Sequence, residues 1–366
     1  MVSSIILKIL FFNIIPAFIC VCAFITCDRQ HVYSRRELFV YSLGFGPPLI
    51  SLILMYSFAI FPGKSSGSYV TIVLSFFCFL AFWGRKAFPV MIRNTVRYCN
   101  DWLPKLKNRR YRYEWLAIFL IVSLSLCAYL YIFITVVLSE PLYGQDITSY
   151  GTLGKYVFGE KSLTPFYDRV FQSKGFVFTR THKPFIVLLA VWERIINDIF
   201  EISGDVYFKS LGAYYGILLW LVLFYLVAKK DKWMAVIASA ALVSGFSFGE
   251  ALISAHIDTF RIYMLALAVL FFAFSLKNDA DLLSLSLFGI YGGFAASSHT
   301  IGLGFIVFAI LIFPFFLSSE YSARFKKFLH VVVLIFSTGS FFFVLNLIYG
   351  SDKTLLRIIK TIQHGI

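Results

Sequence analysis

The sequence predicts an all-α, polytopic membrane protein, and three properties support this fold class. Of its 366 residues, 59% are hydrophobic and 14% are charged, whereas soluble domains are about 45–50% apolar and about 25% charged. The mean hydropathy is +0.81. The apolar residues gather in long runs, and a run of about 20 residues crosses a bilayer as a helix. A soluble enzyme, a disordered chain and a coiled coil are therefore excluded.

The apolar runs predict about ten transmembrane helices. They cover residues 3–26, 39–62, 69–84, 115–138, 206–228, 233–252, 258–276, 282–298, 301–318 and 328–349. We divide the chain into an N-terminal part of three helices and a basic loop (1–114), a core (115–349) and a short C-terminal tail (350–366).

Loop charges predict the orientation of these helices. The net charge is +14, and basic residues concentrate in cytoplasmic loops of membrane proteins, so no nucleic-acid partner is needed to explain it. The most basic segment, 85–114, is placed in the cytoplasm. Alternation then puts the other basic loops on the same side; they contain Arg29, Arg35, Arg36, Lys229, Lys230, Lys232, Lys277, Arg324, Lys326 and Lys327. The basic tail falls on the other side, which leaves room for one more span near the end.

The same alternation places the longest loop, 139–205, on the outer side. Within 147–158, apolar residues recur at helical spacing among polar ones, which predicts an amphipathic helix. Residues 184–200 form a second, more apolar stretch that is short for a span and carries charges near its middle. We predict that both are helices lying along the outer membrane interface.

The first candidate site residues lie in this loop. Glu140, Asp146 and Tyr150 follow a span, and Asp146 stands at the start of the first predicted interfacial helix. One interpretation makes Asp146 a helix N-cap; the other makes it a general base at the membrane face. Sequence spacing leaves both open.

Potential anion-binding residues precede the second interfacial helix. Arg180, His182 and Lys183 are three potential cations next to lipid. They suit a phosphate site, or they anchor the helix by reaching to the headgroups.

Two further polar clusters fall at outer helix junctions. His256, Asp258 and Arg261 surround the start of one span; an Asp258–Arg261 pair at i,i+3 is the structural alternative to a functional role. His299 lies at another junction, where a lone histidine is more often structural. Because all four clusters fall on the outer side, we expect one outward-facing cavity for an anionic, partly lipidic ligand.

The order of these features resembles the GT-C superfamily of membrane glycosyltransferases, which use polyprenyl-phosphate-linked sugars. The resemblance runs from about Tyr131 to Tyr349, roughly 60% of the chain, and lies in pattern, not in a long identical motif. It rests on Asp146 with Tyr150, Gly151, Gly154, Phe158 and Gly159, on His182 to Trp192, on Gly204 to Gly212 and on Ala228 to Lys230.

The resemblance implies a seven-helix core, two juxtamembrane helices in the outer loop and catalysis by Asp146 with inversion at the sugar. Substrate binding is assigned to Glu140, Tyr150, Arg180, His182, Lys183, His256, Asp258, Arg261 and His299. Many members have two adjacent acids in this loop, whereas Gln145 precedes Asp146 here. We therefore expect no cofactor, and a divalent metal is not indicated.

The implied partners are a polyprenyl-phosphate-linked sugar donor, a glycan, lipid or protein acceptor, and membrane lipids. A membrane partner subunit is a further option, since most members continue beyond this core. We expect a bacterial inner-membrane protein with its site facing the periplasm. One alternative is a polysaccharide polymerase or ligase acting on lipid-diphosphate glycans, because the stretch Gly144–Tyr150 resembles one found in some of these enzymes. A transporter is a further alternative with less support.

Overall fold

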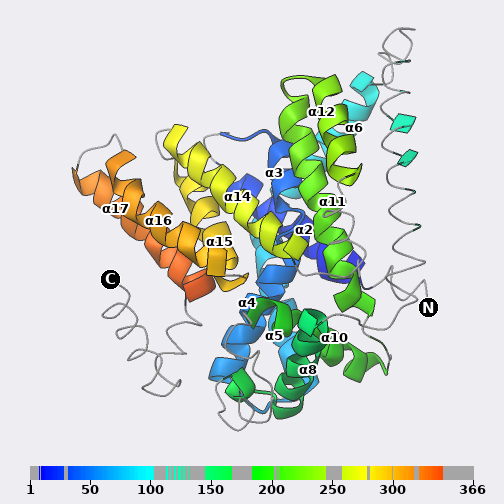
Figure 1. Ribbon diagram of the computed structural model, residues 1–366, viewed down its shortest axis with the longest axis vertical. Helices are drawn as coiled ribbons and strands as arrows, with labels where there is room; N and C mark the ends of the chain where they lie inside the picture. Colours follow the sequence, from blue (N-terminus) through cyan, green and yellow to red (C-terminus); the bar gives the residue numbers. More distant parts are fainter. Residues whose placement is uncertain are drawn as a thin grey trace. The chain divides into compact units, whose positions relative to one another are not determined.

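In the computed structural model, every regular element of the described residues is helical (Figure 1). The structure describes residues 8, 10–28, 32–102, 113, 116, 119–120, 123–124, 127, 131, 145–166, 184–201, 204, 206–244, 258–277, 281–298, 300–316 and 321–340. The all-α prediction is confirmed over these residues.

The chain divides into two compact units, and four helices are shared between them. Unit 1 contains residues 1–50, 70–148 and 201–263, and unit 2 contains residues 51–69, 149–200 and 264–366. The helices that pass from one unit into the other are α4 (Gly46–Ile60), α5 (Ser66–Gly84), α8 (Gln145–Glu160) and α14 (Asp258–Lys277). The division of the chain at residue 114 stays a prediction.

Unit 1 is built on five further helices: α2 (Ile15–Cys27), α3 (Arg35–Ser42), α6 (Ala87–Trp102), α11 (Val206–Ala228) and α12 (Lys232–Ser244). Helix α2 packs against α3 and α6, and α11 packs against α3. A three-residue turn joins α11 to α12, and these two helices lie side by side (Figure 1).

The break between α3 and α4 is stabilised by tyrosine hydroxyls. Carbonyl groups freed by a helix break need a hydrogen-bond donor inside a membrane protein. Tyr214 donates to the Leu43 carbonyl at 2.5 Å, and Tyr215 donates to the Gly44 carbonyl at 2.9 Å. A Cβ at residue 44 would overlap the Tyr263 ring, so only glycine fits there. The chain can therefore turn by 57° between these helices without leaving those two carbonyls unsatisfied.

Unit 2 contains α8 (Gln145–Glu160, from residue 149), α10 (Pro184–Phe200), α15 (Leu282–Ser298), α16 (Thr300–Phe316) and α17 (Tyr321–Ile335), the last continuing into η6 (Phe336–Ser340). Helix α15 packs on α10, α16 and α17. His330 Nε2 lies 2.9 Å from Ser286 Oγ, and Ser297 donates to the Gly339 carbonyl at 2.6 Å. From the first contact to the second, the residue number rises in both segments, from 286 to 297 and from 330 to 339. Helix α15 and the α17–η6 segment therefore run parallel.

Three described helices are long and apolar enough to cross a membrane: Ser66–Gly84, Tyr207–Ala228 and Asp258–Leu276. They coincide with the predicted spans at 69–84, 206–228 and 258–276. The bent pair α3 and α4 provides a fourth if it counts as one span, and it corresponds to 39–62. Helices Phe11–Cys27, Lys232–Ala241, Leu282–Ser298 and Ile301–Phe315 are apolar but shorter. The span at 115–138 lies mostly outside the described residues, and the span at 328–349 is described only as far as residue 340, so the number ten stays a prediction.

Candidate functional site

Helix α8 is the first of the two helices predicted in the outer loop, and it is longer than the sequence pattern indicated. Tyr150, Leu153 and Val157 are buried and recur at helical spacing, so one stripe of the helix faces protein. The helix begins at Gln145. The backbone of Asp146 therefore lies within the first turn, two residues too late for an N-cap, where a carboxylate is still favoured by the helix dipole.

Helix α10 is the second predicted helix of the loop, and its first half is enclosed by protein. Every residue from Phe185 to Glu193 is buried, so this half presents no side to lipid or water. Gly154 of α8 allows the close approach of α10. A Cβ at residue 154 would lie 3.0 Å from Ala190 Cβ and 3.4 Å from the Val187 carbonyl oxygen. The prediction of a helix is confirmed, but an interfacial position can apply only to the exposed end, residues 198–200.

A buried acid on α10, Glu193, was not among the predicted site residues. It is 1% exposed, and Asp28 is the other buried acid among the described side chains. Asp28 accepts hydrogen bonds from the Val32 and Tyr33 amides at 3.0 and 3.3 Å. Buried carboxylates are common at functional sites. The available sequence signal was an acid directly following a nine-residue stretch, Pro184 to Trp192, without charge.

The ends of α8 and α10 meet the α4–α5 connection in a polar cluster formed by Ser66, Lys161 and Asp198. Ser66 is buried; its hydroxyl donates to the Asp198 carboxylate at 2.6 Å and accepts from the Lys161 ammonium at 3.0 Å. The Lys161 ammonium also lies 3.2 Å from the centre of the Phe158 ring, a cation–π contact. Burial lowers the pKa of Lys161 below its ordinary value, and the nearby Asp198 carboxylate partly opposes this shift.

Backbone contacts reinforce this cluster. The Gly63 amide donates to the Lys161 carbonyl at 2.9 Å, and the Tyr69 hydroxyl lies 3.2 Å from the same oxygen. Lys161 itself has a left-handed backbone, with φ of 49°, a conformation that costs energy in a residue with a side chain. The α4–α5 connection is thus bound to the end of α8 through both main chain and side chains. Predicted alternation places both segments on the outer side.

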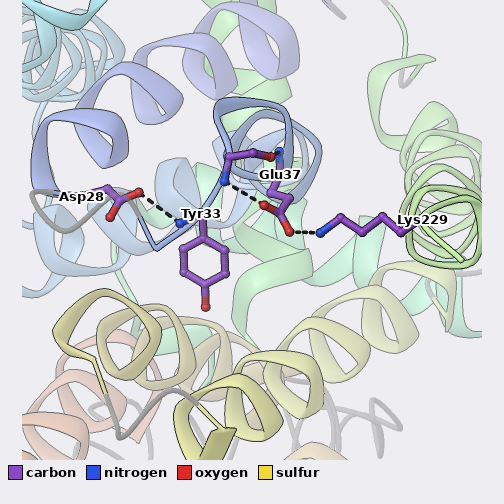
Figure 2. Close-up of polar contacts among 5 residues, drawn as sticks. Asp28, Tyr33, Glu37 and Lys229 are labelled. Atoms are coloured by element: carbon purple, nitrogen blue, oxygen red, sulfur yellow. Dashed lines mark hydrogen bonds and ion pairs between the residues drawn. The ribbon is translucent and has the colours of Figure 1, made fainter.

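At the opposite side of the predicted membrane, an ion pair joins two basic segments of unit 1. Lys229, after α11, pairs with Glu37 of α3, and Glu37 also accepts a hydrogen bond from the Ser34 amide (Figure 2). Ser34 and Glu37 form a capping box that starts α3. Predicted alternation assigns Arg35 and Lys229 to the same cytoplasmic side, so this contact again joins segments of one predicted side.

Among the predicted binding residues, the structure brings Asp258 and Arg261 together. Arg261 Nη1 lies 2.8 Å from Asp258 Oδ1, and their side chains are 15% and 51% exposed. The i,i+3 pair expected as the structural alternative is therefore formed, and it orients the guanidinium at the start of α14. Tyr150 is buried in unit 2, whereas this pair belongs to unit 1.

The remaining predicted site residues lie outside what the structure describes. Glu140, Arg180, His182, Lys183, His256 and His299 fall in that part of the chain, and of Asp146 only the backbone is described. Over the described residues, no group of three or more His, Cys, Asp or Glu side chains is arranged to hold a metal ion.

Comparison with known proteins gives no match: no family model fits this chain, and no curated protein and no solved structure is similar to it. The GT-C-like pattern therefore rests on the residues of this chain.

Proposed function

We propose that this protein is an inverting membrane glycosyltransferase that moves a sugar from a polyprenyl-phosphate carrier to a glycan, lipid or protein acceptor on the periplasmic side of a bacterial inner membrane. The observation that carries the proposal is the construction of the outer loop. Two helices, α8 and α10, pack closely at Gly154, and Asp146 lies in the first turn of α8. A pair of packed loop helices with an acid near the start of the first is in line with what the family resemblance implies, although the first half of α10 is enclosed by protein.

The side assignments of the proposal are supported by three independent contacts. The cluster of Ser66, Lys161 and Asp198 joins two segments assigned to the outer side. The Glu37–Lys229 ion pair joins two assigned to the cytoplasm. Helices α15 and α17 run parallel, as two helices that both enter from the cytoplasm must. A count that is wrong by one span between any of these pairs would place the partners on opposite sides.

In the proposed reaction, Asp146 removes the proton from an acceptor hydroxyl while the oxygen of that hydroxyl attacks the anomeric carbon. The bond from that carbon to the phosphate oxygen breaks, and polyprenyl phosphate leaves with the electron pair, so the anomeric configuration inverts. A positioned base contributes roughly 10²- to 10⁴-fold. The leaving phosphate requires cations, for which Arg180, Lys183, His256 and Arg261 are the candidates.

Two described features refine these roles. Asp258 holds Arg261 by its ion pair, so the guanidinium is oriented before any ligand binds. Glu193 supplies a buried carboxylate on α10, the helix against which α8 packs. We assign Arg261 to the donor phosphate and treat Glu193 as the second candidate base.

The proposal is tested with a radiolabelled sugar-transfer assay on the full chain in proteoliposomes, with polyprenyl-monophosphate sugars as donors and a membrane lipid extract as acceptor. Asp146→Asn is expected to lower transfer by at least about 10²-fold. Glu160→Gln, at the exposed end of the same helix, removes a charge of the same sign and is expected to leave transfer unchanged.

Other outcomes redirect or overturn the proposal. Transfer that survives Asp146→Asn but is lost in Glu193→Gln keeps the reaction class and moves the base; Glu140 and Asp258 come next. Activity with lipid-diphosphate glycans alone, and none with any monophosphate donor, would establish a polymerase or ligase instead.

A further inference from the structure

Helix α6 follows span α5 after a two-residue turn and has one side against the protein. Helix α6 packs on α2, and just before it Gly84, the last residue of α5, meets the backbone of α2, where an added Cβ would lie 2.8 Å from Cys22 Cβ. Ala87, one turn later, is buried, and Met91 is half-buried. The Phe88 ring makes an edge-to-face contact with Phe18 at 5.6 Å. This side fixes the orientation of α6 within unit 1.

A second side of α6 is apolar and exposed. Phe88, Ile92 and Val96 are spaced four residues apart, so they form a continuous stripe along the helix. Their exposed fractions are 46%, 49% and 54%. Although the Phe88 ring contacts Phe18 at one edge of the stripe, the described residues leave about half of each of the three side chains exposed, and an aqueous surface would make three such neighbouring side chains unfavourable.

A third side of α6 is basic. Arg93 is exposed, and Arg97 follows it at four residues; Lys86, in the turn just before the helix, is exposed as well. At about 100° per residue, this basic stripe lies roughly a third of a turn beyond the apolar stripe. A helix with neighbouring apolar and basic sides is suited to the boundary between acyl chains and headgroups. The sequence places it on the cytoplasmic side, where anionic lipid attracts basic segments.

We propose that α6 is a binding site for anionic phospholipid at the cytoplasmic interface. The stripe of Phe88, Ile92 and Val96 enters the acyl-chain region, and Lys86, Arg93 and Arg97 bind headgroup phosphates. Charge complementarity selects anionic lipid over neutral lipid as the occupant, and the adjoining membrane span keeps the helix at that depth. The inference is independent of the proposed sugar transfer, since α6 belongs to the other side of the predicted membrane.

The test measures lipid retention by native mass spectrometry of the full chain in neutral detergent, titrated with phosphatidylglycerol or phosphatidylcholine. The wild type is expected to prefer phosphatidylglycerol, and added salt is expected to weaken that preference. A Lys86→Gln/Arg93→Gln/Arg97→Gln variant is expected to lose at least about tenfold of the preference, given roughly fivefold per basic residue near an anionic surface. Arg324→Gln/Lys326→Gln/Lys327→Gln removes the same charge elsewhere on the predicted cytoplasmic side and is expected to change the preference less than about twofold.

Two more variants serve as controls. Lys86→Arg/Arg93→Lys/Arg97→Lys keeps the charge and is expected to keep the preference, even if the glutamine variant is poorly folded. Ile92→Ser/Val96→Ser is expected to weaken retention of both lipids while leaving headgroup selectivity intact. Equal loss in the two glutamine variants, or a wild type without preference, would overturn the assignment to α6.

Discussion

The packing of α8 on α10 leads to a prediction about Gly154, because the two helices touch where this residue has no side chain. A Cβ there would lie 3.0 Å from Ala190 Cβ, which is tighter than ordinary contact. Gly159, five residues later in the same helix, has no atom within 4 Å of the corresponding position. The two glycines therefore form a matched pair within one helix.

We expect Gly154→Leu to destabilise the protein and Gly159→Leu to leave it unchanged or slightly more stable. Leucine gains up to about 1 kcal/mol over glycine from helix propensity at either site. Overpacking against α10 costs about 1–3 kcal/mol, and this term arises at residue 154 alone. The propensity gain largely cancels between the variants, so their unfolding free energies are expected to differ by about 1–3 kcal/mol.

The comparison is made by unfolding both variants in mixed detergent micelles and following helix content by circular dichroism. Sugar transfer, once established for the wild type, is expected to fall in Gly154→Leu because α8 carries Asp146. Two variants of equal stability, within about 0.5 kcal/mol, would show that α8 and α10 do not pack through Gly154.

Two further predictions concern the cluster at the ends of these helices. Ser66→Ala removes hydrogen bonds to both charged partners and is expected to lower the free energy of unfolding by about 1–2 kcal/mol, since the exposed Asp198 can be hydrated instead. Ser68→Ala, which affects a hydroxyl near Ser65, serves as the control. Equal unfolding midpoints for the two variants would contradict the role of Ser66. Because burial lowers the pKa of Lys161, its amine is expected to react with acetic anhydride at lower pH than an ordinary lysine, as measured by mass spectrometry. Asp198→Asn should move that reaction to still lower pH, and a shift to higher pH would refute the charge coupling. The contribution of Lys161 to stability is expected to rise with pH between its lowered pKa in the folded protein and its ordinary pKa in the unfolded chain.

The sequence alone determined the class of the molecule and its local helices. Long apolar runs predict membrane helices because each span must satisfy its own backbone hydrogen bonds, and three described helices coincide with such runs. The stripe of Tyr150, Leu153 and Val157 likewise indicated α8, because residues at helical spacing share one side. The Asp258–Arg261 pair was predictable for the same reason, since its partners are three residues apart.

Tertiary structure decided what lies beyond one helical turn. Composition shows that 184–200 is apolar, but only packing reveals that its first half is enclosed and that Glu193 is buried with it. The cluster of Ser66, Lys161 and Asp198 joins residues up to 132 positions apart, a distance at which no local periodicity carries information. The same holds for Glu37 and Lys229, 192 positions apart. Propensity and hydropathy act between neighbours along the chain, whereas these contacts depend on how the helices pack, and that is fixed when the whole chain has folded.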